Sequence, residues 1–140
     1  MKHGLTFRFF ALLLYPLLSY SAFAADKNNT DVYFISPQDG STVKSPVSIK
    51  FGLKGMGVAP AGVNIDNTGH HHLLIDLKHQ PDLTQSLPAN DNIKHFGGGQ
   101  TETLLELSPG THTLQLLLGD YLHKPHRVPV LSKKITITVK

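Results

Sequence analysis

Residues 69–77 have the sequence GHHHLLIDL, and their alternation indicates the fold class. Successive side chains of a β-strand point to opposite faces of the sheet. His71 therefore shares one face with Leu73 and Ile75, and His70 and His72 share the other. The same period of two recurs in five further segments: residues 32–35, 47–51, 101–107, 111–118 and 135–139. This pattern predicts an all-β protein.

Short strands at this spacing are typical of a single immunoglobulin-like antiparallel β-sandwich, with a small barrel as the alternative. The 12 glycines and 9 prolines argue against long helices. Ser108-Pro109-Gly110 predicts a hairpin between its two flanking strands. Two long loops, residues 54–69 and 78–99, border the histidine strand. Loops of this length are usually functional or disordered, and their position favours function.

Residues 1–24 have the three parts of a secretory signal peptide. Lys2 and Arg8 provide the positive start, residues 9–18 the apolar core, and residues 22–24 the small side chains at the cleavage positions. The apolar run is shorter than the roughly 20 residues of a membrane-spanning helix. We therefore expect cleavage after Ala24.

Cleavage there leaves a polar tail over residues 25–30, which we expect to be disordered, and one domain over residues 31–140. The chain has 13 basic and 10 acidic residues, and two of the basic ones belong to the signal peptide. A nearly neutral mature chain lacks the basic stripe of a nucleic-acid-binding protein. The absence of cysteine excludes disulfides and thiolate metal sites. We expect a periplasmic or secreted protein with no membrane span after cleavage.

Eight of the nine histidines follow the signal peptide: His70, His71, His72, His79, His95, His112, His123 and His126. His70 and His72, on one face of a strand, can converge on a single ion. The segment GDYLHKPH (residues 119–126) adds a carboxylate, Asp120, and the imidazoles of His123 and His126. Because imidazole nitrogen suits zinc, copper, nickel and iron, these residues predict a transition-metal site.

Two further histidines extend the predicted ligand set. His95 precedes Phe96 and a run of three glycines, a segment able to approach a ligand closely. His112 is in phase with Leu114 and Leu116, a position more often taken by a core histidine than by a ligand. Glu102 is an alternative to Asp120 as the carboxylate. The complete predicted set is His70, His72, His95, His112, His123, His126 and Asp120.

Residues 31–140 resemble a family of small exported bacterial domains classified only as a domain of unknown function. The motifs that carry the resemblance are YFISPQDG (33–40), GMGVAPAG (55–62), NTGHHHLLID (67–76), HFGGGQTE (95–102) and PGTHTLQL (109–116). The resemblance implies a complete family domain and no particular activity.

The opening segment SPQDGSTV (36–43) is also similar to that of periplasmic copper-resistance sandwich proteins. Those proteins typically bind copper through a histidine at the mature N-terminus, whereas cleavage after Ala24 would leave Ala25 there. The resemblance therefore implies a shared fold, and a copper site in this chain would be built differently.

These observations support three functions. The first is a periplasmic protein that binds copper or zinc through its histidines. The second is a non-enzymatic immunoglobulin-like module that binds an envelope protein or a glycan through its long loops. The third and least supported is a hydrolase with histidine and Asp120 or Glu102 as acid and base, since no serine or cysteine lies in a nucleophile-elbow motif.

Overall fold

The computed structural model describes Met1 and residues 30–140. Most of the expected signal peptide and polar tail lies outside the described residues, so both remain predictions. Among the described residues there is no helix long and apolar enough to cross a membrane.

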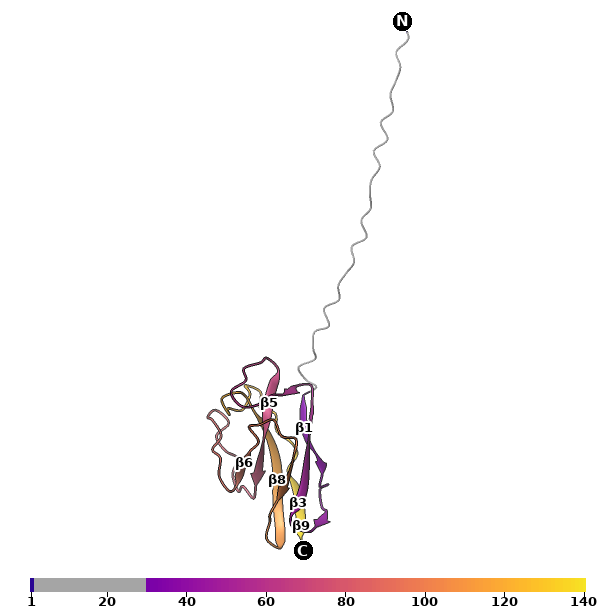
Figure 1. Ribbon diagram of the computed structural model, residues 1–140, viewed down its shortest axis with the longest axis vertical. Helices are drawn as coiled ribbons and strands as arrows, with labels where there is room; N and C mark the ends of the chain where they lie inside the picture. The colour runs from indigo at the N-terminus through magenta and orange to yellow at the C-terminus, as the bar shows by residue number, and fades with distance from the viewer. Residues whose placement is uncertain (2–29) are drawn as a thin grey trace.

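Within residues 30–140, nine strands form two sheets. Figure 1 shows how they are arranged. The smaller sheet has the order β1-β3-β7, and the larger has the order β2-β9-β8-β5-β4, with β6 paired to β5. The bounds are β1 Asp31–Ser36, β2 Thr42–Val43, β3 Val47–Lys54, β4 Gly57–Val58, β5 Thr68–Ile75, β6 Ile93–His95, β7 Glu102–Leu105, β8 Gly110–Gly119 and β9 Ile135–Val139. The prediction of an all-β sandwich is confirmed.

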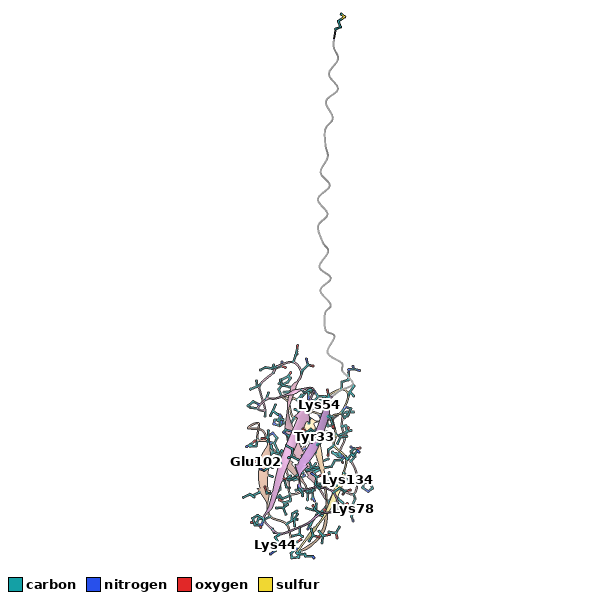
Figure 2. All side chains as sticks on the ribbon, turned by 90° about the vertical axis from the view of Figure 1, so that its right-hand side faces the viewer. Tyr33, Lys44, Lys54, Lys78, Glu102 and Lys134 are labelled. Atoms are coloured by element: carbon teal, nitrogen blue, oxygen red, sulfur yellow. The ribbon has the colours of Figure 1, made fainter. Side chains whose placement is uncertain are left out.

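The main core fills the space between the two sheets. Val32, Ile49 and Phe51 of the smaller sheet pack against apolar residues of β5, β8 and β9, among them Leu73 and Leu116. Most of these residues lie at alternate positions of their strands, so the period of two in the sequence marks the faces that meet. Figure 2 shows the opposite, outer face of the smaller sheet, where Tyr33 lies among charged side chains.

β5 is buried on both faces, and this determines where its histidines lie. Residues 69–75 are all buried. The outer face is covered by the segment between β5 and β6, where Leu74 and Leu117 pack against Leu87 and Ile93 in a second, smaller core. Part of the expected loop 78–99 therefore forms a lid over the larger sheet and ends in a strand.

Some expectations about the connections are wrong. Ser108-Pro109-Gly110 does not close a hairpin, because β7 pairs with β3 in one sheet while β8 pairs with β5 and β9 in the other. Pro and Gly chemistry favours a turn without specifying which strands pair across it. β2 and β4 form short parallel pairs with β9 and β5, in addition to the expected antiparallel ladders.

Candidate metal centre

β5 places His70 and His72 side by side on the outer face of the larger sheet. Both side chains are 0% exposed, and their ring centroids are 4.8 Å apart. His71 points to the other face, into the main core, where its ring lies 5.1 Å from that of Phe51. The three consecutive histidines are thus divided between two environments by strand alternation.

β6 brings a third imidazole to the same place. His95 is the register partner of His72 in the antiparallel β5–β6 pair. Directly opposed residues of a sheet have side chains on one face, so His95 joins His70 and His72. The His95 Nε2 lies 3.1 Å from the His70 Nε2, and one of these nitrogens donates a hydrogen bond to the other.

The spacing of the three imidazoles fits one metal ion. His70, His72 and His95 each offer a ring nitrogen, and these atoms lie within 4.8 Å of one another. A tetrahedral ion with metal–nitrogen distances of about 2.1 Å holds its ligand nitrogens about 3.4 Å apart. The separation between His70 and His95 is already close to that value. The three side chains could therefore hold a metal ion after small rotations.

Two glycines allow the rings to lie close to the backbone. A Cβ added to Gly97 would lie 2.3 Å from the Cε1 of His95, and one added to Gly119 would lie 2.7 Å from the Cε1 of His72. Any other residue at either position would displace a ring. The sequence shows both glycines, and the run after Phe96 indicated a close approach, but nothing identified Gly119 as a contact of His72.

Burial keeps the imidazoles of the cluster in their neutral form. It lowers the pKa of His70 to about 4, with further lowering from His95 and His123, while the charge of Asp120 acts in the opposite sense. Burial also lowers the pKa of His72 to about 3, and lowers the pKa of His95. Neutral imidazole is the form that binds metals, so protons compete little at neutral pH.

Several buried ring nitrogens near the cluster lack a hydrogen-bond partner. These are Nδ1 of His70 and both nitrogens of His72. A buried polar atom without a partner costs about 1–3 kcal/mol. A metal ion bonded to one nitrogen of each ring would offset part of that cost, which makes the donor set a good fit for such an ion.

His123 lies at the edge of the cluster. Its ring centroid is 4.6 Å from that of His95, 5.2 Å from that of His70 and 6.4 Å from that of His72. The loop that carries His123 follows β8 and is held by Asp120, whose Oδ1 accepts hydrogen bonds from the backbone N–H groups of Leu122 and Lys124.

Asp120 and His126 lie beside the cluster, in a separate small cavity. This cavity of about 160 Å³ is also lined by Tyr121 and by residues 63–68. The Nε2 of His126 is buried without a hydrogen-bond partner. The pKa of His126 is lowered, because the effect of burial outweighs the opposite effect of the Asp120 charge. The structure therefore brings these two predicted residues close to the site but not into the three-imidazole group.

His112 is not brought to the cluster. It is the register partner of Ile137, whereas Gly119 at the other end of β8 is the partner of His70. Seven residues along a strand correspond to about 23 Å, and His112 is on the core face of the sheet. Its Nδ1 lies 2.7 Å from a carboxylate oxygen of Asp76, and this hydrogen bond raises the pKa of His112.

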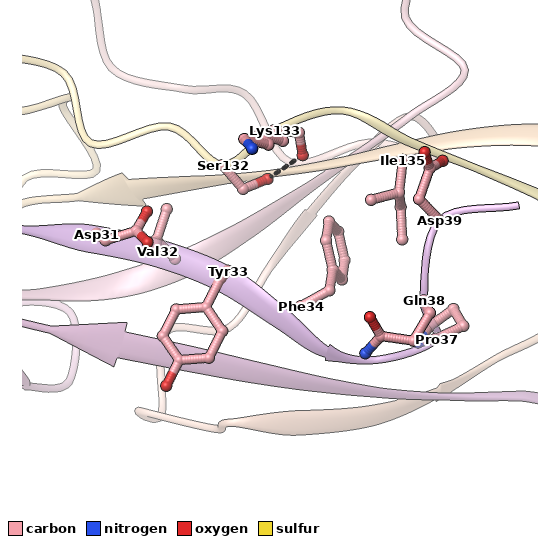
Figure 3. Close-up of a pocket in the computed structure, with 10 residues that line it drawn as sticks. All are labelled: Asp31, Val32, Tyr33, Phe34, Pro37, Gln38, Asp39, Ser132, Lys133 and Ile135. Carbon is pink, nitrogen blue, oxygen red and sulfur yellow. Dashed lines mark hydrogen bonds between the residues drawn. The ribbon is translucent and has the colours of Figure 1, made fainter.

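Glu102, the alternative carboxylate, lies on β7 of the other sheet and forms a 3.8 Å ion pair with Lys50. Figure 3 shows another cavity, of about 310 Å³, beside β1. It is lined by residues 31–34, 37–39, 132, 133 and 135, and no histidine is among them. Neither feature adds a ligand to the site.

A family model described as "Domain of unknown function (DUF4399)" matches residues 49–140, which include His70, His72, His95 and the neighbouring His123. No curated protein matches the chain. Among solved structures, the chain is similar to the X-ray structure of the endo-beta-1,4-mannanase from Thermotoga petrophila, with 19% identity and a TM-score of 0.48. That similarity covers 84% of this chain and 21% of the enzyme's chain.

Proposed function

The chain belongs to this family of domains of unknown function (DUF4399), whose description carries no activity, and we propose that it binds a transition-metal ion in the bacterial periplasm. The observation that supports the proposal is the group formed by His70, His72 and His95, with ligand atoms within 4.8 Å of one another. Two of these side chains are fully buried, and a buried polar cluster normally has partners for its nitrogens.

The ligand type narrows the choice of ion. Nitrogen-only sites suit borderline ions such as Zn(II) and Cu(II), whereas magnesium and calcium prefer oxygen ligands. With no cysteine in the chain, thiolate-dependent metal sites are excluded. We therefore propose zinc or copper as the bound ion. The periplasmic location follows from the signal peptide expected over residues 1–24.

The test is a metal titration of the full chain, expressed for export and purified without a histidine tag. We expect near-stoichiometric binding of Zn(II) or Cu(II) and a melting temperature that rises with metal concentration, since binding to the folded state stabilises it. His95→Asn should weaken this binding strongly, because it removes one of three nitrogens from a partly exposed position.

His79→Asn is the matched control, since His79 is an exposed loop histidine outside the group. Wild-type binding weaker than about 10 μM, or binding that His95→Asn leaves unchanged, would contradict the proposal. The long loops around the site would then favour the second candidate, a module that binds an envelope protein or a glycan.

A further inference from the structure

We propose that His123 is the fourth ligand of the metal site, so that the ion is held by four imidazoles and enclosed by the loop over residues 120–126. This inference rests on the proposed metal binding by His70, His72 and His95. It adds the coordination number and identifies the part of the chain that closes the site.

The arrangement of the four rings is close to that around one tetrahedral ion. Imidazoles bound to such an ion at about 2.1 Å have ring centroids about 5.3 Å apart. Five of the six centroid distances among His70, His72, His95 and His123 lie between 4.6 and 5.2 Å. The sixth, between His72 and His123, is 6.4 Å. Only the distance between the rings of His72 and His123 is longer than the expected value, by about 1 Å, so the ring of His123 has to move toward the other three.

The backbone of His123 has an unfavourable conformation that the loop maintains. His123 has a φ of +63°, in the left-handed region. A non-glycine residue there costs about 1–3 kcal/mol, and such residues cluster at ligand-binding sites. A glycine would give the same turn without this cost. The presence of histidine at this strained position is explained if its imidazole binds the metal ion.

Hydrogen bonds on both sides hold this turn. The His123 N–H donates to the Asp120 carbonyl, and the Asp120 N–H donates to the Lys124 carbonyl. The lid segment contributes two more bonds, from the Leu87 N–H to the His123 carbonyl and from the Ser86 hydroxyl to the Leu122 carbonyl. The ring of His123 is therefore presented from a preorganised backbone, which lowers the entropy lost on binding a metal.

The four ligands differ in exposure, and this indicates the route to the ion. His70 and His72 are fully buried on β5, whereas His95 and His123 are partly exposed. A metal ion arriving from solvent meets His95 and His123 first. Movement of the His123 ring toward the ion then displaces the remaining water from it. The result is a closed site without the open position of a catalytic zinc.

The test compares Co(II) binding to the wild-type chain and to His123→Gly. Glycine keeps the left-handed turn and its backbone hydrogen bonds, so the metal-free variant should be at least as stable as the wild type. We expect the wild type to show the intense visible bands of four-coordinate Co(II). The variant should show weaker, shifted bands and about tenfold or more weaker binding, since loss of even an outer-sphere partner of a ligand costs about 10–100-fold.

His123→Asn is the second variant, because asparagine tolerates a left-handed φ and has no imidazole; it should behave as His123→Gly does. Two results would overturn the inference alone: a wild-type spectrum without four-coordinate bands, or equal spectra and affinities for wild type and His123→Gly while His95→Asn loses binding. No Co(II), Zn(II) or Cu(II) binding by the wild type would overturn the proposed function together with this inference.

Discussion

At the scale of single residues, the site depends on glycine as much as on histidine. Gly97 and Gly119 each leave space that an imidazole occupies, at distances where no Cβ is tolerated. The two rings are therefore positioned by close contact with the backbone, and the ring of His95 also by its hydrogen bond with His70. Substitutions at these glycines test ring placement without removing a ligand.

Gly97→Ala should weaken metal binding by displacing His95, whose ring atoms lie 2.3–3.2 Å from the added Cβ. A displacement of about 1 Å in a ligand is comparable to losing an outer-sphere partner, so we expect about a 10–100-fold loss of affinity. Isothermal titration with Zn(II) measures it. Gly98→Ala is the control, because its Cβ meets only the flexible end of Gln100, at 3.0 Å. Equal losses in both variants would contradict the argument.

His112 has a separate role that predicts its own pH dependence. Asp76 raises the pKa of His112 through the 2.7 Å hydrogen bond. A raised pKa in the folded state gives a stabilisation that is full below the unfolded pKa of about 6.5 and is lost as pH rises through the folded value. His112→Asn should therefore lower the free energy of unfolding more at pH 5.5 than at pH 8.5, by about 1 kcal/mol or less for such a partly exposed pair. Urea unfolding at both pH values checks the sign, and a larger loss at pH 8.5 would be inconsistent with it.

At the scale of elements, the sequence predicted the long strands and missed the short ones. β3, β5, β8 and β9 have enough alternating residues to show their period. β2, β4 and β6 have two or three residues each and no period to detect. This limit affected the site directly. The faces of His70 and His72 follow from alternation within β5, whereas the position of His95 depends on the pairing of β6, which no local pattern reveals.

His112 is the predicted ligand that lies far from the cluster, and the direction of β8 explains its position. His112 lies near the start of β8 and His123 follows its end, so the length of this ten-residue strand separates the two histidines in space. The number of histidines in a chain does not show which of them are neighbours in space, because composition contains neither strand register nor strand direction. The face of His112 was predictable from its phase with Leu114, and that phase already favoured the core.

The lid between β5 and β6 contributes to the stability of the fold, and it also leads into β6, the strand that carries His95. Leu87 is 7% exposed and packs on Leu74 and Leu117 of the larger sheet. Leu87→Ala should destabilise the protein by about 2–4 kcal/mol and loosen β6, because truncation of a buried leucine leaves a cavity. Hydrogen exchange of the amides in residues 93–95, together with Zn(II) affinity, measures both effects. Gln85→Ala, at an exposed position of the same segment, should change neither; unaltered exchange in Leu87→Ala would show that β6 does not depend on the lid.

At the scale of the whole molecule, the buried histidines connect the proposed metal binding with the stability of the protein at acidic pH. The pKa values of His70 and His72 are lowered to about 4 and about 3 in the folded state. The unfolded chain, with histidine pKa values near 6.5, therefore binds more protons below that pH, and the free energy of unfolding falls as pH falls from about 6.5 toward 4. The metal-free protein should lose thermal stability over this range.

Thermal unfolding of the metal-free chain at pH 7.5, 6, 5 and 4.5 measures the effect. Saturation with Zn(II) at pH 7.5 should raise the melting temperature. At a free metal concentration 100 times the dissociation constant, the free energy of unfolding should increase by about 2.7 kcal/mol. The gain should shrink at low pH as protons compete for the ring nitrogens. A melting temperature of the metal-free protein that does not change between pH 7.5 and 4.5 would contradict the assignment of buried, neutral rings.

The three consecutive histidines of β5, His70 to His72, also affect the register in which β5 pairs with β8. A slip of one residue between β5 and β8 exchanges the faces of every side chain. His70, His72 and Leu74 would then enter the space between the sheets, and His71, Leu73 and Ile75 would leave it. The slip would thus replace one aliphatic side chain of the core by one more imidazole, so the alternation that places His70 and His72 on one face also disfavours the nearest mispaired alignment. In this chain the three consecutive histidines of β5 therefore favour the correct register as well as placing His70 and His72 on one face.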